Sequence, residues 1–347
     1  MTISKAIIKW YQLNARNLPW RNTKDPYLIW VSEIIMQQTR VEQGLDYYLR
    51  FVKMFPNIRS FSQSSEDQVL KLWQGLGYYS RARNMMFAAQ QVMDQYDGVF
   101  PSTYEDILKL KGVGPYTTAA IASFCFDLPY AVVDGNVFRV LARYYGINTP
   151  IDTHKGQKEF AVLAQEILNR EKAGTHNQAM MEFGALLCKA KNPICSHCPL
   201  ADSCDALANQ IITELPKKEK KLRVINKYLH FFYISNGHHI LIQKRDYSNI
   251  WKGLYQLPLI ETDKSENADF VLNLGRKSSI LSDHDFQLVS IQDVNHKLTH
   301  RNLHIRFYHI KEEEFSENDY LQIELEKLDD YAFPRPIEKY LKTLIKH

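Results

Sequence analysis

Four of the five cysteines of this 347-residue chain lie in one short segment, as Cys188, Cys195, Cys198 and Cys204. The spacing C-x6-C-x2-C-x5-C allows four thiolates to surround either one tetrahedral metal ion or one cubane cluster. Zinc sites usually contain two C-x2-C pairs separated by a longer spacer, and this segment contains a single short pair. The spacing therefore favours an iron–sulfur cluster, with zinc or unliganded thiols as the alternatives.

The composition is that of a globular protein of about two domains, with 45% hydrophobic and 24% charged residues. The net charge of +4 permits a nucleic-acid partner without arguing for one, because local patches matter more than the total. No apolar run reaches the roughly 18 residues of a membrane helix, and the N-terminus lacks the apolar core of a signal peptide. We expect a cytoplasmic protein with no membrane contact.

Residues 1–212 are expected to form an all-α domain. Apolar residues recur at helical spacing, for example at Ile3, Ile7 and Tyr11. The string from Ser102 to Glu105 has the spacing of a capping box and predicts the start of another helix.

The sequence pattern changes after residue 212. Residues 213–228 include a run of lysines and arginines, which predicts a basic linker that either lies near phosphates or is simply solvated. In residues 229–347 the hydrophobic period becomes two, and Asn236-Gly237 between two apolar runs predicts a β-hairpin. We expect this part to be a separate, smaller α+β domain.

The string Lys111-Gly112-Val113-Gly114 separates two helical patterns. Its two glycines allow a tight turn that presents bare backbone N–H groups to a phosphate at the N-terminus of the next helix. An ordinary turn between helices is the alternative.

Two carboxylates are candidates for catalytic groups. Asp134 precedes Gly135-Asn136 and has the signature of a helix N-cap. Glu33 lies in an apolar helical stretch, where burial would raise its pKa and let it act as an acid near neutral pH. A solvated position on a helix surface is the alternative for Glu33.

Taken in order, these strings resemble the MutY family of the endonuclease III and helix-hairpin-helix superfamily. The resemblance covers nearly the whole chain. It implies one 4Fe-4S cluster on the four cysteines and a hairpin at residues 111–114 that binds double-stranded DNA. It also implies that Glu33 protonates a flipped adenine at N7, while Asp134 stabilises the oxocarbenium-like sugar.

Position 116 separates the subfamilies. Bifunctional relatives carry there a lysine that attacks the sugar, and this chain has Tyr116 instead. The resemblance therefore implies a monofunctional glycosylase, in which Tyr116 donates a hydrogen bond to a catalytic group.

The resemblance assigns further residues to DNA and to the adenine. Gln38 and Tyr78, the latter within a run from Leu76 to Asn84, match the segments that wedge the duplex open, and Thr39 is expected to contact the DNA. Trp20, Arg21 and Glu182 match the residues that line the adenine pocket.

The run from Trp251 to Pro258 resembles a strand of Nudix-like domains. No glutamate box for magnesium follows it, so phosphohydrolysis is not expected and a binding role fits better. In the MutY family an F-S-H loop of this domain reads 8-oxoguanine, and the matching residues here are Leu298, Thr299 and His300. Leucine replaces the aromatic residue, while threonine keeps the hydroxyl.

The resemblance thus predicts a monomeric base-excision-repair enzyme that removes adenine mispaired with 8-oxoguanine or guanine. In a bacterium it would work at the nucleoid. Two alternatives remain: a related glycosylase for mismatched thymine or uracil, and a non-catalytic iron–sulfur DNA-binding protein. The second alternative needs no pair of carboxylates.

Overall fold

The computed structural model describes residues 2–37, 39–219, 224–246, 250–282, 286–315 and 319–344. The chain forms two compact units. The first consists of Met1–Gln63 and Asn84–Lys220, and the second of Ser64–Arg83 and Lys221–His347. The segment Ser64–Arg83 therefore folds with the C-terminal part of the chain, although residues on both sides of it belong to the first unit.

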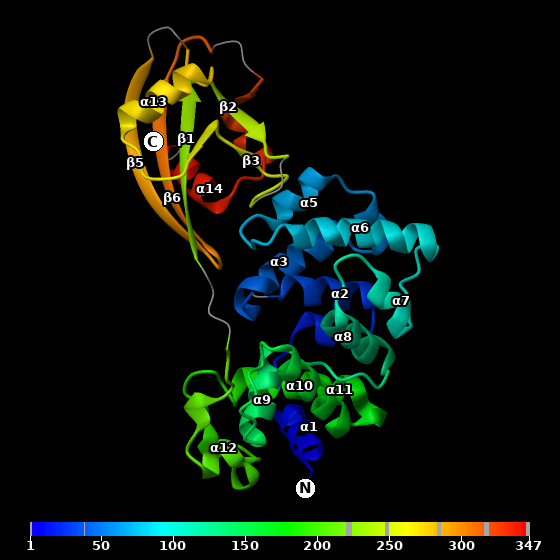
Figure 1. The fold of residues 1–347 in the computed structure, drawn as a ribbon. Coiled ribbons are helices and arrows are strands. Elements are labelled where there is room, and N and C mark those ends of the chain that lie inside the picture. Colours follow the sequence, from blue (N-terminus) through cyan, green and yellow to red (C-terminus); the bar gives the residue numbers. More distant parts are fainter. Residues whose placement is uncertain are drawn as a thin grey trace. The chain divides into compact units, whose positions relative to one another are not determined.

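The first unit is helical, as the sequence predicts (Figure 1). Its helices are α1 (Ile3–Asn14), α2 (Pro26–Ile35), α3 (Val41–Met54), α4 (Ile58–Ser62), most of α6 (Ser80–Gln95), α7 (Tyr104–Lys109), α8 (Pro115–Phe126), α9 (Gly135–Tyr144), α10 (His154–Ile167), α11 (Ala173–Leu186) and α12 (Asp205–Ala208). Short 3₁₀ turns span Pro19–Arg21, Arg170–Lys172, Cys195–His197, Ala201–Ser203 and Ile212–Glu214.

Helix α11 lies at the centre of the first unit, because it packs against α1, α8 and α9. Its buried Phe183 joins a core that includes Ile7 of α1 and Phe160 of α10. Helix α8 also packs against α2. These contacts bring together helices that lie far apart in the sequence, and they position the residues of the candidate site.

Helix α7 begins one residue later than the sequence predicts. The N-cap is Thr103, whose hydroxyl oxygen accepts a hydrogen bond from the backbone N–H of Asp106 at 3.2 Å. The predicted capping box on Ser102 and Glu105 is thus wrong by one position. Both sites offer a hydroxyl followed three residues later by a carboxylate, so the sequence pattern alone does not separate them.

The second unit contains a seven-stranded sheet with the main order β3-β2-β1-β6-β5. The strands are β1 (Ile225–Ser235), β2 (His239–Lys244), β3 (Tyr255–Gln256), β4 (Leu259–Thr262), β5 (Gln287–Leu298), β6 (Arg301–Lys311) and β7 (Leu321–Glu324). The helices are α5 (Glu66–Trp73), α13 (Ala268–Lys277) and α14 (Arg335–Leu344), with a 3₁₀ turn at Leu325–Asp330.

Alternation along the strands gives the sheet two apolar faces. Phe231 and Phe307 belong to a core with Ile337 of α14, whereas Phe232 belongs to the opposite core with Val271 of α13. One helix therefore covers each face (Figure 1). This arrangement confirms the α+β architecture expected for the C-terminal part.

The hairpin predicted at Asn236-Gly237 is confirmed. Strands β1 and β2 pair antiparallel around Asn236, whose side-chain oxygen accepts hydrogen bonds from the N–H groups of His238 and His239. Strands β5 and β6 form a second antiparallel hairpin, in which Leu298 pairs with Arg301. Thr299 and His300 make up its two-residue tip.

Helix α5 is fastened to the sheet unit by polar contacts. The carboxylate of Asp67 accepts from the Lys244 ammonium at 2.6 Å and from the Tyr255 hydroxyl at 3.3 Å. The Lys71 ammonium donates to the backbone oxygen of Tyr331 at 3.0 Å. These contacts explain why Ser64–Arg83 belongs to the second unit.

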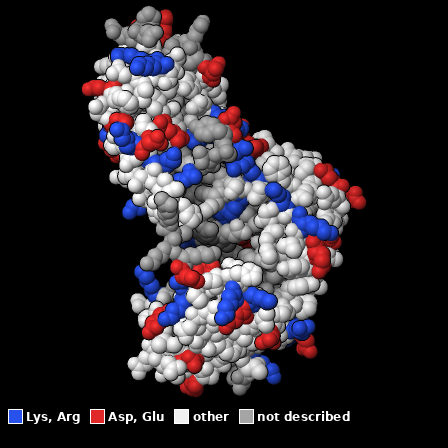
Figure 2. Space-filling view, viewed as in Figure 1, with Lys and Arg blue, Asp and Glu red and all other residues white. Residues whose placement is uncertain are grey.

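On the face shown in Figure 2, basic side chains are interspersed with acidic ones, in agreement with the small net charge. Within the described residues, no helix is both long enough and apolar enough to cross a bilayer.

The cap of α7 gives a first prediction. Thr103→Ala removes the acceptor of the first turn and should lower the free energy of unfolding by about 1 kcal/mol. Ser102→Ala is the matched control and should change it by less than about 0.5 kcal/mol. Denaturant unfolding of the full chain measures both. A loss confined to the Ser102 variant would contradict the assigned cap.

Candidate active site

Glu33 is a buried carboxyl in the last turns of α2, with 7% of its surface exposed. Its neighbours Ser32 and Ile34 are also buried, so the whole stretch lies inside the first unit. The Tyr116 hydroxyl, near the start of α8, donates a hydrogen bond to Glu33 Oε2 at 2.7 Å. The contact between α2 and α8 therefore places a proton donor directly on a buried carboxyl.

The surroundings of Glu33 favour its protonated form. Burial raises the pKa of Glu33 to about 7, against the Tyr116 hydrogen bond, which lowers it. The negative charge of Asp134 raises this pKa further, and the positive charge of Arg21 lowers it. At neutral pH this carboxyl is therefore balanced between its acid and carboxylate forms.

Asp134 is the N-cap of α9. Its Oδ1 accepts from the backbone N–H groups of Asn136 and Val137, both at 2.8 Å, and its Oδ2 accepts from the Asn136 amide at 2.7 Å. Burial raises the pKa of Asp134, but these three donors act against the rise. Donors of this kind stabilise the ionised carboxylate.

Tyr116 connects the two carboxylates electrostatically. Burial raises the pKa of Tyr116 far above its ordinary value, and the charges of Glu33 and Asp134 add to the rise. Tyr116 therefore keeps its proton and remains a hydrogen-bond donor. The two carboxylates and this phenol share one electrostatic environment, so the structure brings together the three residues predicted as catalytic.

Glu182 forms a buried double ion pair. Its carboxylate accepts from Arg21 at 2.9 and 2.6 Å and from Arg16 at 2.9 and 2.7 Å. Burial alone would raise the pKa of Glu182, but the two guanidinium groups hold it at about 2. Both predicted residues, Arg21 and Glu182, are thus in direct contact, and Trp20 packs edge-on against Tyr48 with ring centroids 5.1 Å apart.

Arg16 is a member of this cluster that sequence reasoning missed. It lies five residues before Arg21, in a stretch with no recognisable motif, and its partner Glu182 is 166 residues away. The one feature of the sequence that could have indicated Arg16 is its position close to Trp20 and Arg21.

The hairpin at residues 111–114 contains one glycine with a special conformation. Gly112 has φ +77°, and a Cβ there would lie 2.6 Å from the Cβ of Asn84. Gly114 caps α8 in an extended conformation with open space around it. Val113 is buried, and the backbone N–H of Lys111 donates to the Gln91 side chain at 2.7 Å. The Lys111 amide is therefore already occupied within the protein.

The four cysteines line one pocket together with the buried Arg143. The Arg143 guanidinium lies 3.5 Å from the Cys188 sulfur and donates to the backbone oxygens of Lys189 and Leu215. A buried cation beside four thiols fits a group that carries negative charge. The donor set and the charge therefore suit an iron–sulfur cluster with thiolate ligands.

Hydrogen bonds connect the cysteine segment to Asp134. Arg139 donates to the backbone oxygen of Cys188 at 2.7 Å and to the side-chain oxygen of Asn136 at 2.8 Å. Asn136 in turn donates to Asp134 Oδ2. Helix α9 thus carries a continuous polar path from the cysteines to the candidate site.

In the second unit, the Tyr78 hydroxyl lies 2.7 Å from the Thr299 hydroxyl. Tyr78 has a left-handed backbone, with φ +47°, and its side chain is exposed. Leu298 is half-buried against the sheet core, whereas Thr299 and His300 are exposed at the hairpin tip. The predicted wedge tyrosine and the predicted base-reading hairpin therefore meet in the same unit.

Two predicted DNA contacts, Gln38 and Thr39, follow α2 in the sequence. Gln38 is outside the described residues. Thr39 is half-buried and its hydroxyl contacts the backbone oxygen of Gln37 at 3.4 Å.

Comparison with known families gives three matches along the chain. Residues 31–166 match the HhH-GPD superfamily of base excision DNA repair proteins. Residues 188–204, bounded by Cys188 and Cys204, match the iron-sulfur binding domain of endonuclease III. Residues 230–343 match the NUDIX domain. The chain thus carries an iron–sulfur binding segment between a helical repair domain and a Nudix-like domain.

Sequence similarity to one known protein extends over nearly the whole chain, and a second relative is similar over part of it. An adenine DNA glycosylase of Buchnera aphidicola subsp. Schizaphis graminum is 34% identical over 98% of this chain and 97% of its own length. An adenine DNA glycosylase of Homo sapiens is 37% identical, with coverage of 58% of this chain and 38% of the human protein.

Among solved structures, a thermostable thymine-DNA glycosylase aligns with a TM-score of 0.55 at 28% identity, covering 59% of this chain and 95% of its own. Endonuclease III in a non-covalent DNA complex aligns with a TM-score of 0.52 at 22% identity, covering 60% of this chain and 94% of its own. The latter likeness concerns the fold.

The burial of Glu33 makes stability depend on pH. Because its folded pKa of about 7 exceeds the ordinary 4.5, the protonated folded state is favoured at low pH, and this advantage is lost as pH rises from 4.5 to 7. Glu33→Gln cannot ionise, so its stability relative to the parent should rise by about 2.5 kcal/mol between pH 5 and pH 8. Unfolding of both chains at the two pH values measures this.

Glu159→Gln makes the same chemical change on an exposed residue of α10 and is the control. It should differ from the parent by less than about 0.5 kcal/mol at both pH values. A constant difference between the Glu33 variant and its parent would contradict the raised pKa.

Proposed function

This chain belongs to the adenine DNA glycosylase family, and we propose that it hydrolyses the N-glycosidic bond of adenine mispaired with 8-oxoguanine or guanine. One observation carries the proposal: the buried Glu33 carboxyl, bonded to Tyr116 and influenced by the charge of Asp134, has a pKa of about 7. A glycosylase needs one carboxyl in its acid form and a second one ionised. The rest of the mechanism follows from this pair.

The target adenine must leave the base stack before it reaches buried groups. Gln38 and the exposed Tyr78 are our candidates for the side chains that fill the gap, and Thr39 is a candidate for a further contact to the DNA. Gly112 and Gly114 shape the hairpin that would bind the DNA backbone, with the N-terminus of α8 next to it. These contacts would hold a double-stranded substrate.

Glu33 supplies the proton in the proposed reaction. Adenine is a poor leaving anion, and transfer of the Glu33 proton to N7 allows it to leave as a neutral base. The Tyr116 hydroxyl stays bonded to Oε2 and stabilises the carboxylate that forms. Arg21 and Glu182 form the nearby ion pair that would shape the wall of the adenine pocket, together with Trp20.

Asp134 stabilises the sugar in the proposed reaction. Departure of the base leaves positive charge on C1′ and the ring oxygen, and an ionised Asp134 lowers the energy of this cation. Its cap geometry fixes the carboxylate in place. Water then adds to C1′, and the proton released by the water restores Glu33.

The absence of a lysine at position 116 supports a monofunctional enzyme. Tyr116 keeps its proton and cannot act as an amine nucleophile toward C1′. The proposed product is therefore free adenine and an abasic site in an uncut strand.

We assign a 4Fe-4S cluster to Cys188, Cys195, Cys198 and Cys204. When bound, such a cluster holds the loop in one conformation. Among the described residues, no three His, Cys, Asp or Glu side chains are grouped as the ligands of one ion would be. Four thiols that line a common pocket beside the buried Arg143 would suit thiolate ligation of such a cluster.

Recognition of 8-oxoguanine is assigned to the hairpin tip at Leu298, Thr299 and His300. Its support is the placement of an exposed hydroxyl beside Tyr78, in a cavity of about 580 Å³ that Trp251 also lines. We place catalysis in residues 1–212 and base reading in 229–347, joined by the linker 213–228, in a monomeric enzyme.

Adenine excision depends on both carboxylates in different ways. Glu33→Gln should lower the single-turnover rate by about 10²-fold or more, because the acid is lost, while duplex binding persists. Asp134→Asn should also lower the rate, yet it keeps the cap of α9, because asparagine caps helices equally well. Glu159→Gln is the control. Full excision by Glu33→Gln would refute the assignment.

The hydroxyl of Thr299 should set the preference for the oxidised base. Thr299→Val should reduce the ratio of excision opposite 8-oxoguanine to excision opposite guanine by about fivefold, the worth of one hydrogen bond. Thr299→Ser keeps the hydroxyl and should restore the ratio. The same duplex series with thymine or uracil opposite guanine tests the alternative substrate, and excision of those bases alone would overturn adenine as the target.

A further inference from the structure

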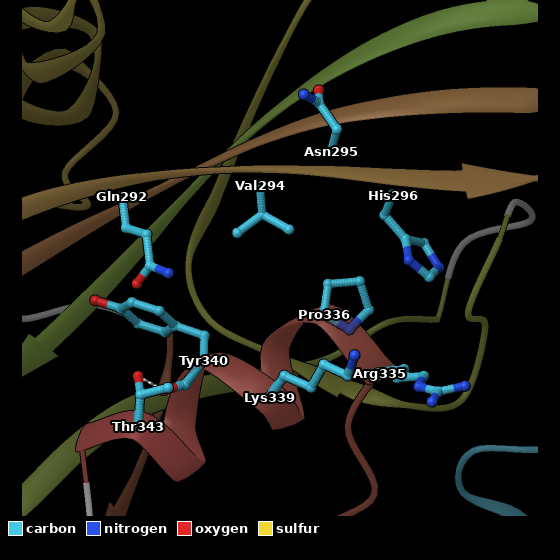
Figure 3. A pocket seen from close by; sticks show the side chains of 9 residues that line it. All are labelled: Gln292, Val294, Asn295, His296, Arg335, Pro336, Lys339, Tyr340 and Thr343. Atoms are coloured by element: carbon cyan, nitrogen blue, oxygen red, sulfur yellow. Dashed lines mark hydrogen bonds between the residues drawn. The ribbon is translucent and has the colours of Figure 1, made fainter.

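The second unit contains a cavity of about 440 Å³ between strand β5 and helix α14. Gln292 and His296 point from β5 toward the helix, and Arg335, Lys339 and Tyr340 line the other side (Figure 3). Asn295 points away from the helix in the same view and bonds to His304 at 2.9 Å. The cavity is therefore formed by one face of the strand and one side of α14 along its length.

The cavity carries positive charge. Its nine lining residues include Arg335 and Lys339 and no aspartate or glutamate. Within the described part of the chain, neither of these cations forms an ion pair with a carboxylate. Burial lowers the pKa of His296, and the charges of Arg335 and Lys339 lower it further. An anion would therefore be attracted to this space.

Tyr340 gives an independent sign of a missing polar partner. The side chain is 4% exposed, and among the described residues its hydroxyl has no hydrogen-bond partner. Its ring is fixed by stacking on Phe307, with centroids 4.0 Å apart. Figure 3 shows its hydroxyl end on the side of Gln292. A buried hydroxyl without a partner is unfavourable unless something else accepts its proton.

We propose that this cavity binds a phosphate group of the DNA strand that carries the oxidised base, an inference that rests on the proposed function. Arg335 and Lys339 would neutralise the phosphate, and the Tyr340 hydroxyl would donate to it. Such charged donors bind phosphate more strongly than neutral ones.

The position of the cavity favours a backbone phosphate over a free nucleotide. His296 and Arg335 also line the cavity beside the Thr299 tip. His296 lies three residues before Thr299, a span of about 10 Å, which equals about three nucleotide steps of a duplex strand. A DNA strand whose oxidised base is read at Thr299 would therefore have a phosphate, a few nucleotides away from that base, close to Lys339.

The test uses the salt dependence of duplex binding by the full chain. Lys339→Gln should weaken binding to every duplex severalfold and reduce the slope of log Kd against log salt by about 1, because one phosphate contact is lost. Lys342→Gln on the same helix makes the same charge change at a residue paired with Glu338 and outside the cavity, and it should leave the slope unchanged.

Tyr340→Phe provides a second variant. It should weaken duplex binding severalfold without lowering the unfolding midpoint, because the hydroxyl has no hydrogen-bond partner among the described residues to lose. Equal slopes for the Lys339 and Lys342 variants, with unaltered binding by Tyr340→Phe, would overturn the proposal.

Inorganic phosphate and dAMP distinguish the source of the anion. If dAMP binds the DNA-free chain and Lys339→Gln abolishes this binding while the duplex slope stays unchanged, the cavity takes free nucleotides and the backbone assignment is wrong. Excision is measured separately with the parent chain. Failure of excision overturns the proposed function, whereas the salt slopes and the duplex binding of Tyr340→Phe decide the phosphate site.

Discussion

The hydrogen bond from Tyr116 to Glu33 is the interaction on which the candidate site depends. It forms only because α2 and α8 pack together, so a carboxyl and a phenol 83 residues apart meet inside the first unit. Burial disfavours a charge on Glu33, and the neighbouring Asp134 disfavours a second one. The protein thereby keeps one acid partly protonated near neutral pH, while a chemically similar group has hydrogen-bond donors that favour its ionised form.

Several other features of the first unit serve the same geometry. Asp134 owes its position to the start of α9, and Arg139 on that helix joins it, through Asn136, to the cysteine segment. The pair of arginines on Glu182 fixes α11 against the segment after α1. The electrostatic balance of the site is therefore built from helix ends and buried ion pairs that lie far apart in the sequence.

Local sequence signals predicted much of this arrangement. The helical texture before residue 212, the Asn236-Gly237 hairpin and the cap at Asp134 depend on neighbours within a few residues, so the pattern contains them. Arg16 escaped prediction because its role exists only through Glu182. The start of α7 was misplaced because Ser102 and Thr103 offer equivalent caps in the local sequence pattern. The pairing of Ser64–Arg83 with the sheet depends on contacts such as Lys71 to Tyr331 that no local pattern reveals.

That pairing means that the chain passes from one unit to the other three times, after residues 63, 83 and 220. Segments of the two units therefore alternate along the sequence, instead of one unit following the other. A truncated gene ending in the linker would still encode α5 but not Lys244, Tyr255 and Tyr331, which hold it. Loss or exchange of the Nudix-like part during evolution would thus require compensating changes in residues 64–83, which ties the inheritance of the two halves together.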